Sequence, residues 1–304
     1  MALGTAGVRI GGGVSVPLSW LRGENGAGWL LISPSFLYAL LMLAVPIVAI
    51  LVLSFWTQID LAFDHTATLA NYREAWTNPL YRTLMLRSLW ISGAVTVVTV
   101  LLAYPVAYYV SFYGGRRKAL WLFLLTIPFW TSYLLRVFAW KVILGNGGVL
   151  NSGLIGIGLI AEPLPWLLYN SGAVVVTLAH AWAPFAILPI YASLEKLDRS
   201  LLEAATDLGD GPLRRFLRVT LPLSMPGVIA AALIVFIPTV GDYVTPRLVG
   251  GKDGVMIANI IQAQFGKGSN WPLGAALSIS AMLIVAVVAV AVVLLGRRFG
   301  GKTA

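Results

Sequence analysis

Residues 195–222, EKLDRSLLEAATDLGDGPLRRFLRVTLP, form a polar connection between two long stretches that carry no charged residue. These stretches are 163–194 and 219–241. Each is long enough for a helix that crosses a bilayer, which takes about 20 mostly apolar residues. We call residues 195–222 the interspan loop, because the pattern places it outside the membrane between two spanning helices.

Four further stretches without charge occupy residues 25–59, 88–115, 119–135 and 268–296. Each predicts one helix, since a backbone in lipid has no water with which to pair. Of the 304 residues, 59% are hydrophobic and 11% are charged, whereas soluble domains carry about a quarter charged residues. The composition therefore predicts an all-α integral membrane protein with six transmembrane helices. The net charge of +9 does not indicate a nucleic-acid partner, because the basic residues lie between apolar runs rather than on a soluble face.

A seventh uncharged stretch, VILGNGGVLNSGLIGIGLIA at residues 142–161, contains six glycines and two asparagines. Each glycine costs a helix up to about 1 kcal/mol relative to alanine. We therefore expect this stretch to lie outside the bilayer core, as short interfacial helices rather than as a span.

The basic residues predict the orientation, because short cytoplasmic loops carry an excess of Lys and Arg. With six spans and the N-terminus inside, thirteen of the 21 basic residues are cytoplasmic. We expect a flexible cytoplasmic tail at 1–28, a permease domain at 29–297 and a cytoplasmic tail at 298–304. The N-terminal stretch lacks the compact apolar core of a cleaved signal peptide, so the first span is expected to remain in the mature protein.

The interspan loop has the pattern of two short helices joined by a turn. Ser200 followed by Glu203 fits a capping box, which predicts that a helix begins near Leu201. Gly209 is placed to end that helix in a left-handed conformation, and Pro212 favours the start of a second helix. An alternative interpretation is a helix on the membrane surface whose arginines face anionic lipid.

The spacing of the loop favours a different interpretation. Glu203, Ala204 and Ala205, then Gly209, then Leu221 and Pro222 resemble the EAA loop of ABC importer permeases, with Val219 where isoleucine is usual. The resemblance implies that these six residues form a coupling helix that docks on an ATPase subunit.

Other segments extend this resemblance over most of the chain after residue 85. Residues 127–140, 145–154, 192–209, 222–227 and 236–251 look like the B-type permease of spermidine/putrescine importers. The resemblance implies a type I ABC permease fold in the inner membrane. It also implies a second homologous permease, two ATP-binding subunits that use ATP and magnesium, and a periplasmic binding protein. Related permeases handle opines, other amines or amino acids, so the substrate stays open.

One nucleotide-binding motif occurs as a string of letters: Gly296, four residues, then Gly301, Lys302 and Thr303. A phosphate-binding loop needs a strand before it and a helix after it. Here a predicted span precedes the motif and the given sequence ends at Ala304. We therefore expect no ATPase activity and no cofactor on this chain, and the two distant histidines and absent cysteines predict no metal site.

A polyamine path should offer carboxylates and aromatic faces, because ring quadrupoles attract cations within about 6 Å. The candidate pathway residues are Asp242, Tyr243, Phe236, Trp130 and Tyr133. The alternative is that Asp242 pairs with Arg247 and that the aromatic residues form interfacial belts. An ion-coupled secondary transporter is a rival function, but the six uncharged stretches offer no buried acidic relay for it. A membrane enzyme is a further rival, for which no nucleophile and base pattern is found.

Overall fold

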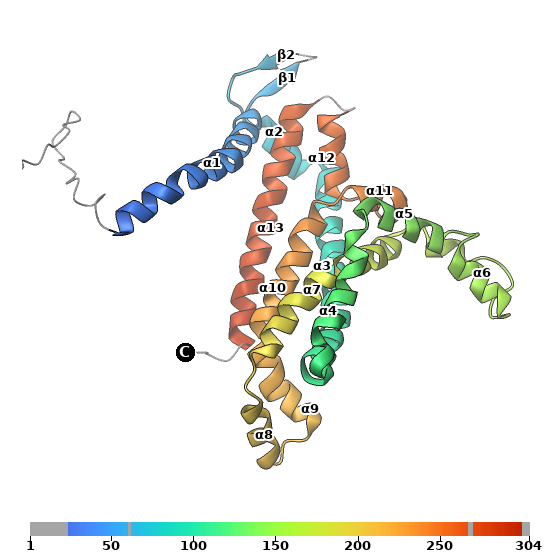
Figure 1. Ribbon diagram of the computed structural model, residues 1–304. Coiled ribbons are helices and arrows are strands. Elements are labelled where there is room, and N and C mark those ends of the chain that lie inside the picture. The colour runs from blue at the N-terminus through green and yellow to red at the C-terminus, as the bar shows by residue number, and fades with distance from the viewer. Residues whose placement is uncertain (1–23, 60–61, 267–269, 300–304) are drawn as a thin grey trace, which may run out of the picture. The chain divides into compact units, whose positions relative to one another are not determined.

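The computed structural model describes residues 24–59, 62–266 and 270–299 (Figure 1). The chain divides into two units, the first ending at Leu53 and the second beginning at Ser54. Most of the expected N-terminal tail and the Lys302 end of the nucleotide-like motif lie outside the described residues.

The first unit contains the helix α1 (Glu24–Leu53). Its candidate span, Leu31–Leu53, has the high mean hydropathy of 2.9, and none of it is buried within the protein. An apolar helix with no covered face is suited to a surrounding of lipid or of other apolar helices.

The second unit begins with a two-stranded antiparallel hairpin that pairs Gln58 with Phe63. Its strands and helices are β1 (Thr57–Ile59), β2 (Ala62–Asp64), α2 (Ala70–Thr77), α3 (Pro79–Tyr113), η2 (Gly115–Arg117), α4 (Lys118–Thr126), η3 (Ile127–Trp130), α5 (Tyr133–Leu144), α6 (Val149–Gly156), η4 (Pro165–Leu167), α7 (Ser171–Glu195), α8 (Arg199–Asp207), α9 (Pro212–Arg215), η5 (Phe216–Thr220), α10 (Leu221–Val240), α11 (Val244–Val249), α12 (Ile257–Phe265) and α13 (Trp271–Phe299).

The core lies where α3, α7 and α10 pack side by side (Figure 1). Its buried side chains include Ile91 and Val95 of α3, Leu178 of α7 and Val235 of α10. Helices α7 and α10 approach closely at Gly227, where an added Cβ would lie 2.5 Å from the carbonyl oxygen of Pro189. Small residues at such crossings let membrane helices pack without a hydrophobic driving force.

A second apolar cluster joins α2, α3, α12 and α13 at the other end of α3. Leu84 of α3 and Leu277 of α13 are buried there. The backbone amide of Ile257 donates a 2.7 Å hydrogen bond to Ser88 Oγ. This bond satisfies an amide at the start of α12, which would otherwise be an unpaired buried group.

Six helical segments of the described chain are long and apolar enough to cross a membrane: Leu31–Leu53, Pro79–Tyr113, Tyr133–Gly156, Ser171–Glu195, Pro212–Val240 and Trp271–Arg298. The prediction of a helical protein with six candidate spans is confirmed. Five of the segments overlap most of the corresponding uncharged stretches predicted from the sequence. The third, Tyr133–Gly156, shares only residues 133–135 with the predicted stretch 119–135 and includes residues 142–156, which we expect to lie outside the bilayer core.

The predicted third span, residues 119–135, is not a single helix. The chain forms α4, the 3₁₀ turn η3 and then α5, with Thr131 and Ser132 in extended conformations. Pro128 explains part of the break, because proline supplies no amide to the helical ladder. The absence of charge therefore identified an apolar segment correctly, but it did not predict that the helix is interrupted.

The glycine-rich stretch 142–161 forms the end of α5 and the separate eight-residue helix α6. The helices part at Gly148, where a Cβ would lie 2.2 Å from the carbonyl oxygen of Val142. The expectation of a short helix is confirmed, and its depth relative to a bilayer stays a prediction.

Candidate functional site

The interspan loop folds into α8, a tight turn and α9, and η5 joins it to α10 (Figure 1). The N-cap of α8 is Asp198, whose Oδ1 accepts a 2.9 Å hydrogen bond from the Ser200 backbone amide. The predicted capping box of Ser200 and Glu203 is therefore wrong, and α8 begins at Arg199. The Asp198 side chain, at the N-cap, accepts a hydrogen bond from an otherwise unpaired amide at the positive end of the helix. Ser200 lies inside the helix, where its side chain cannot act as the N-cap.

Hydrogen bonds from Ser200 hold the pKa of the Asp198 carboxyl below its usual value. Because the folded pKa is lowered, the contribution of this cap to α8 is fully present above the unfolded pKa of about 3.9. It is lost as pH falls through the lower folded value. The cap is therefore intact at neutral pH.

The turn after α8 depends on Gly209, whose φ is +86°. Its amide donates to the Thr206 carbonyl at 2.9 Å, and the Asp210 amide donates to the Ala205 carbonyl at 3.0 Å. These bonds satisfy the last carbonyls of α8 in the way that a left-handed cap does. The predicted left-handed conformation at Gly209 is confirmed.

Two side-chain contacts fold the second half of the loop back onto the first. Arg215 Nη1 donates to Thr206 Oγ1 at 2.9 Å, and Arg218 Nη1 lies 3.3 Å from Asp210 Oδ1. Exposed ion pairs contribute at most about 1 kcal/mol. The shape of the loop therefore rests mainly on its backbone turn and on its caps.

The outer surface of the loop exposes apolar side chains. Leu208 is 87% exposed and Leu213 is 70% exposed, whereas Ala205 is only 7% exposed. Glu203 and Ala204 are exposed as well.

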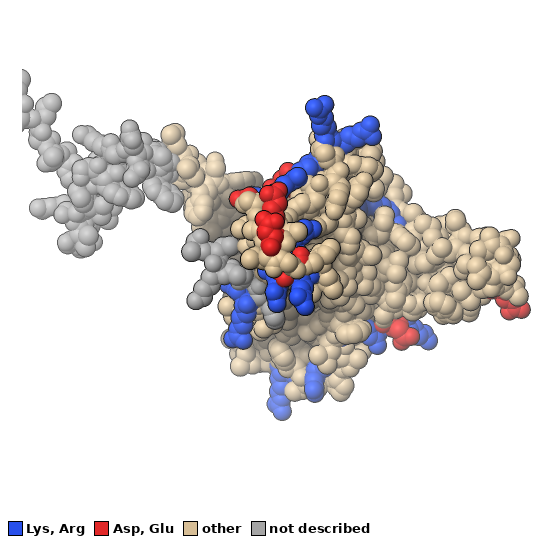
Figure 2. All heavy atoms as spheres, turned by 90° about the horizontal axis from the view of Figure 1, so that it is seen from below, with Lys and Arg blue, Asp and Glu red and all other residues tan. Residues whose placement is uncertain are grey.

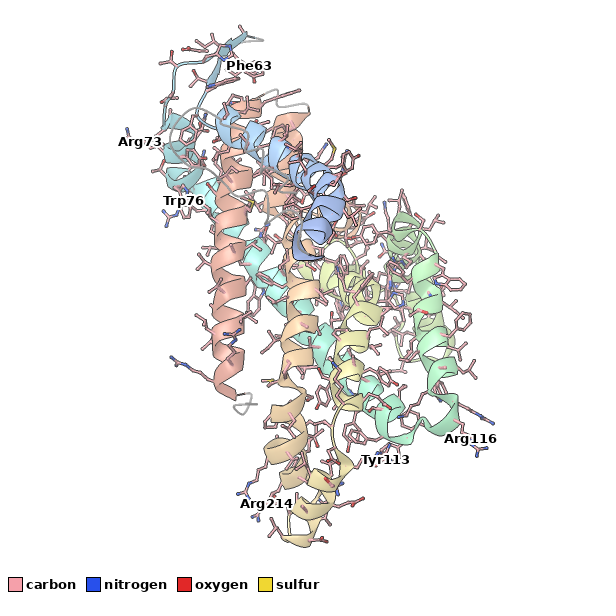
Figure 3. The ribbon with its side chains drawn as sticks, turned by 60° about the vertical axis from the view of Figure 1, so that its left-hand side comes forward. Phe63, Arg73, Trp76, Tyr113, Arg116 and Arg214 are labelled. Atoms are coloured by element: carbon pink, nitrogen blue, oxygen red, sulfur yellow. The ribbon has the colours of Figure 1, made fainter. Side chains whose placement is uncertain are left out.

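Figure 2 views the molecule from the end that carries α8 and α9. Acidic and basic side chains lie close together there, around uncharged surface drawn in tan. Arg214 projects away from the ribbon here (Figure 3). Leu208 and Leu213 are therefore open to contact by another molecule.

Aromatic contacts join the base of the loop to the core. The Phe216 ring meets the Tyr104 ring of α3 edge-on, with centroids 5.5 Å apart. The Tyr104 hydroxyl is 2.8 Å from Ser224 Oγ of α10. Phe216 of η5 therefore packs against α3, and Tyr104 connects α3 with α10.

A second polar cluster surrounds Asp242, just after α10. Its Oδ1 accepts from the Val244 amide at 2.8 Å and so caps α11. Its Oδ2 accepts a 2.5 Å hydrogen bond from the Tyr133 hydroxyl of α5. That hydroxyl also lies 2.5 Å from Thr245 Oγ1. The cluster brings two predicted pathway residues, Asp242 and Tyr133, into direct contact.

A cation already lies beside this cluster. The guanidinium carbon of Arg136 is 5.3 Å from the centroid of the Phe129 ring and 6.0 Å from that of Tyr133. Its Nη1 donates to the Ala181 carbonyl at 3.3 Å. Rings at these distances are suited to cations. Arg136 is not among the candidates predicted from the sequence, although its position one helical turn after Tyr133 places it on the same face of α5.

The remaining predicted pathway residues are not part of the cluster. Phe236 is a core residue, only 6% exposed. Trp130 is 70% exposed and contacts the Phe123 ring. Tyr243 follows Asp242 in the chain and is 43% exposed, and its carbonyl accepts from Asn259 Nδ2 at 2.8 Å.

The alternative pairing of Asp242 with Arg247 is not observed. The ion pairs in the described part of the chain are Lys118 with Glu195 and Arg218 with Asp210. Asp242 instead uses its two oxygens for the α11 cap and for Tyr133. The carboxylate therefore lies close to aromatic surface, and neither ion pair of the described residues includes it.

Six apolar spans, a compact polar loop between two of them and a carboxylate next to aromatic rings define a multi-span membrane protein of the transport class. The chain belongs to the family described as the binding-protein-dependent transport system inner membrane component, whose model matches residues 15–301. It is thus a multi-pass inner-membrane component of such a system.

Its relatives include the spermidine/putrescine transport system permease protein PotB of Haemophilus influenzae, which is 38% identical over 83% of this chain and 87% of the relative. The PotB protein of Escherichia coli K12 is 37% identical over 82% of this chain and 90% of its own length. A further E. coli relative, the inner membrane ABC transporter permease protein YdcU, is 36% identical over 76% of this chain and 78% of its own length.

Among solved structures, a chain of a bacterial alginate ABC transporter in complex with an alginate-bound periplasmic protein matches with a TM-score of 0.72. The match covers 94% of this chain and 99% of that chain at 16% identity. A second alginate transporter structure matches with a TM-score of 0.68. At this identity the likeness shows the fold, which is that of ABC importer permeases.

Proposed function

We propose that this chain is the permease subunit of an ATP-driven ABC importer for polyamines of the spermidine and putrescine type. The observation that carries this proposal is 37–38% identity to PotB permeases over more than four fifths of the chain. The shared length covers the interspan loop, the spans and the Asp242 cluster in one continuous family match.

The proposed assembly contains a second homologous permease, two ATP-binding subunits and a periplasmic binding protein. A match over 29% of the chain to a PotC homolog from Mycoplasma genitalium supports a second permease of related sequence. ATP and magnesium belong to the ATP-binding subunits in this proposal. We assign no cofactor to the chain itself.

The interspan loop is proposed to dock on one ATP-binding subunit. Glu203 and Ala204 are exposed on α8, Ala205 anchors it, and Gly209 sets its end. The exposed leucines at 208 and 213 supply apolar contact. Leu221 and Pro222 begin α10, so movement of the loop is carried directly into a span.

The Asp242 cluster is proposed to line the path of the cation. Oδ2 of Asp242 is bound by the Tyr133 hydroxyl, and it can exchange that partner for a substrate ammonium group. Tyr133, together with the neighbouring Tyr243, offers ring faces. Trp130 is exposed and Phe236 is buried in the core, so we assign Trp130 to lipid-facing surface and Phe236 to core packing.

Two other functions are less well supported. An opine or amino-acid permease would share the same fold, but the PotB relatives favour polyamines. An ion-coupled secondary transporter has no reason to possess a docking loop with exposed leucines.

Both termini are proposed to be cytoplasmic, with residues 1–28 and 298–304 as tails around the permease domain at 29–297. Reporter fusions at Gly115, Gly156 and Gly211 should therefore report inside, outside and inside, because the basic loops stay in the cytoplasm. A cytoplasmic signal at Gly156 would overturn this orientation.

The substrate class is tested by competition. Cells that lack their own polyamine importers and express this chain with its genomic partners should accumulate labelled spermidine or putrescine. Either polyamine in excess should suppress that uptake at least about tenfold, whereas arginine and octopine should not. Suppression by arginine or octopine, but not by polyamines, would assign the permease to another solute.

A further inference from the structure

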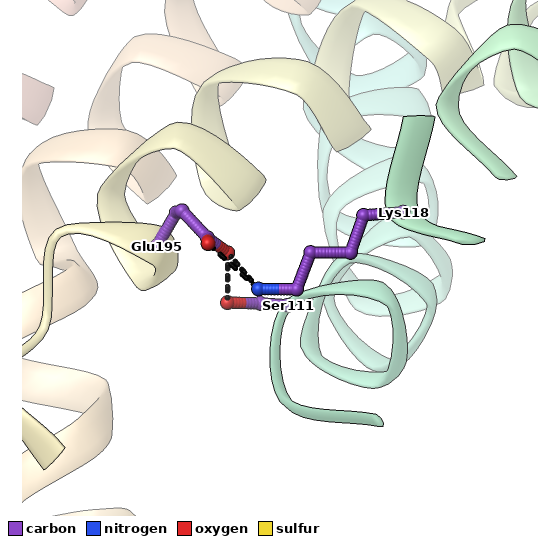
Figure 4. A network of polar contacts seen from close by, with 3 residues as sticks. All are labelled: Ser111, Lys118 and Glu195. Atoms are coloured by element: carbon purple, nitrogen blue, oxygen red, sulfur yellow. Dashed lines mark hydrogen bonds and ion pairs between the residues drawn. The ribbon is translucent and has the colours of Figure 1, made fainter. Parts of the chain in front are cut away.

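The end of α7 and the start of α4 are joined by a network of three polar side chains (Figure 4). Lys118 Nζ donates to both carboxylate oxygens of Glu195, at 2.6 Å and 2.8 Å. Ser111 Oγ, on α3, donates to Oε2 at 3.2 Å. The network therefore contains one residue from each of α3, α4 and α7.

Local helix stability does not account for these charges. Lys118 is the first residue of α4 and Glu195 is the last residue of α7. The helix macrodipole disfavours a cation at the start of a helix and an anion at its end. Each charge is thus at the unfavourable end of its own helix, and the contact across helices compensates both.

The network is a main connection of α4 to the rest of the protein. None of the nine residues of α4, all of them described, is buried. Its other contacts include edge-on ring contacts of Trp121 with Tyr109 and of Phe123 with Trp130, and partial packing of Leu125 on the core. Among the hydrogen bonds of the described residues, those from Lys118 to Glu195 are the ones that join α4 to another element.

The network lies between the two candidate functional regions. Glu195 is separated from α8 by the three residues 196–198. Beyond Lys118, the chain runs through α4 and η3 into α5, which carries Tyr133 and Arg136. A displacement of α8 that moves the end of α7 is therefore passed to α4 through the ion pair and onward toward the Asp242 cluster.

We infer that Lys118 and Glu195 are positioning residues that transmit movement of the interspan loop to the α4–α5 segment. This inference rests on the proposed function, since it assumes that the loop is moved by an ATPase. The pair is partly exposed, with side-chain exposures of 23% and 41%. Partly exposed ion pairs contribute little to folding, so removing this pair should change transmission far more than stability.

Charge reversal tests the inference in the reconstituted complete complex. Lys118→Glu and Glu195→Lys each place like charges together, and each should lower solute uptake per ATP hydrolysed by about tenfold, the order of a typical coupling free energy. The double reversal, Lys118→Glu with Glu195→Lys, restores opposite charges and suits both helix dipoles. It should recover at least half of the wild-type uptake per ATP.

Arg116→Glu is the matched control. Arg116 is exposed, lies two residues before Lys118 and outside the interspan loop, and takes part in neither ion pair of the described chain. This control should keep wild-type coupling. If charge reversal blocks assembly, Lys118→Met keeps the apolar stem and should still uncouple.

Two results would overturn the inference while the wild-type complex remains an active importer. One is wild-type coupling in both single reversals. The other is a double reversal as defective as the single reversals in an intact complex. A wild-type complex that shows no ATP-driven uptake would instead reject the proposed function.

Discussion

Gly209→Asp is expected to abolish coupling between ATP hydrolysis and uptake while the chain still inserts into the membrane. The residue adopts φ +86°, a left-handed conformation that costs a non-glycine residue about 1 to 2 kcal/mol. The introduced carboxylate would also have to lose its water in the proposed docking surface. A cost above about 1.4 kcal/mol corresponds to at least tenfold weaker binding of the ATPase.

Two variants separate these causes. Gly209→Ala carries only the conformational cost, since no atom lies within 4 Å of its added Cβ, and it should show a smaller defect. Gly211→Asp adds the same charge two residues later, where the glycine has an ordinary φ of −67° and is the N-cap of α9. Aspartate is favoured at that position, so this control should retain more activity.

Hydrolysis, uptake and co-purification of the ATPase are the measurements. Equal defects in both aspartate variants would contradict a special role for the turn at Gly209.

Asp242→Asn is expected to lower polyamine uptake at least about tenfold with the complex still assembled. Asparagine keeps an oxygen that can cap α11 in place of Oδ1. Its amide can donate to the Tyr133 hydroxyl, which then donates to Thr245 Oγ1 instead. The local structure is therefore maintained and the negative charge is removed. Hydrogen bonds to charged groups contribute about 1.5 to 3 kcal/mol. This exceeds the free energy of about 1.4 kcal/mol that corresponds to a tenfold change.

Tyr133→Phe is the companion variant, because it keeps the ring face and removes the hydroxyl that occupies Oδ2 of Asp242. It should reduce uptake less than Asp242→Asn does. Asp253→Asn, at an exposed loop position, controls for loss of a negative charge elsewhere. Uptake that stays at the wild-type rate in Asp242→Asn would leave the carboxylate with a structural role only, as the cap of α11.

The sequence predicted the number of spans and the turn of the interspan loop because both follow from local rules. A charge-free stretch of sufficient length is enough to mark an apolar helix. Gly209 can likewise be recognised as a helix end from the local sequence, without tertiary information. The prediction failed at the start of α8, where two possible caps, Asp198 and Ser200, lie within one turn. Only the geometry shows which side chain reaches the free amide.

The contacts between distant segments could not be predicted. Nothing in the spacing of Lys118 and Glu195, 77 positions apart, indicates that they pair. The pairing of Asp242 with Tyr133 rather than Arg247 follows from how α5 and α11 pack. The break of the third predicted span at Pro128 had a local signal, but membrane helices also tolerate proline, as α7 and α10 do at several positions.

The most direct test of the central claim uses proteoliposomes that contain this chain, its second permease and its ATP-binding subunits, with the periplasmic binding protein supplied outside. Labelled spermidine should enter only when ATP is present on the side of the ATP-binding subunits and the binding protein on the other. Omission of either should reduce uptake to the level of empty liposomes. Uptake by this chain alone, driven by an ion gradient and indifferent to ATP, would contradict the account.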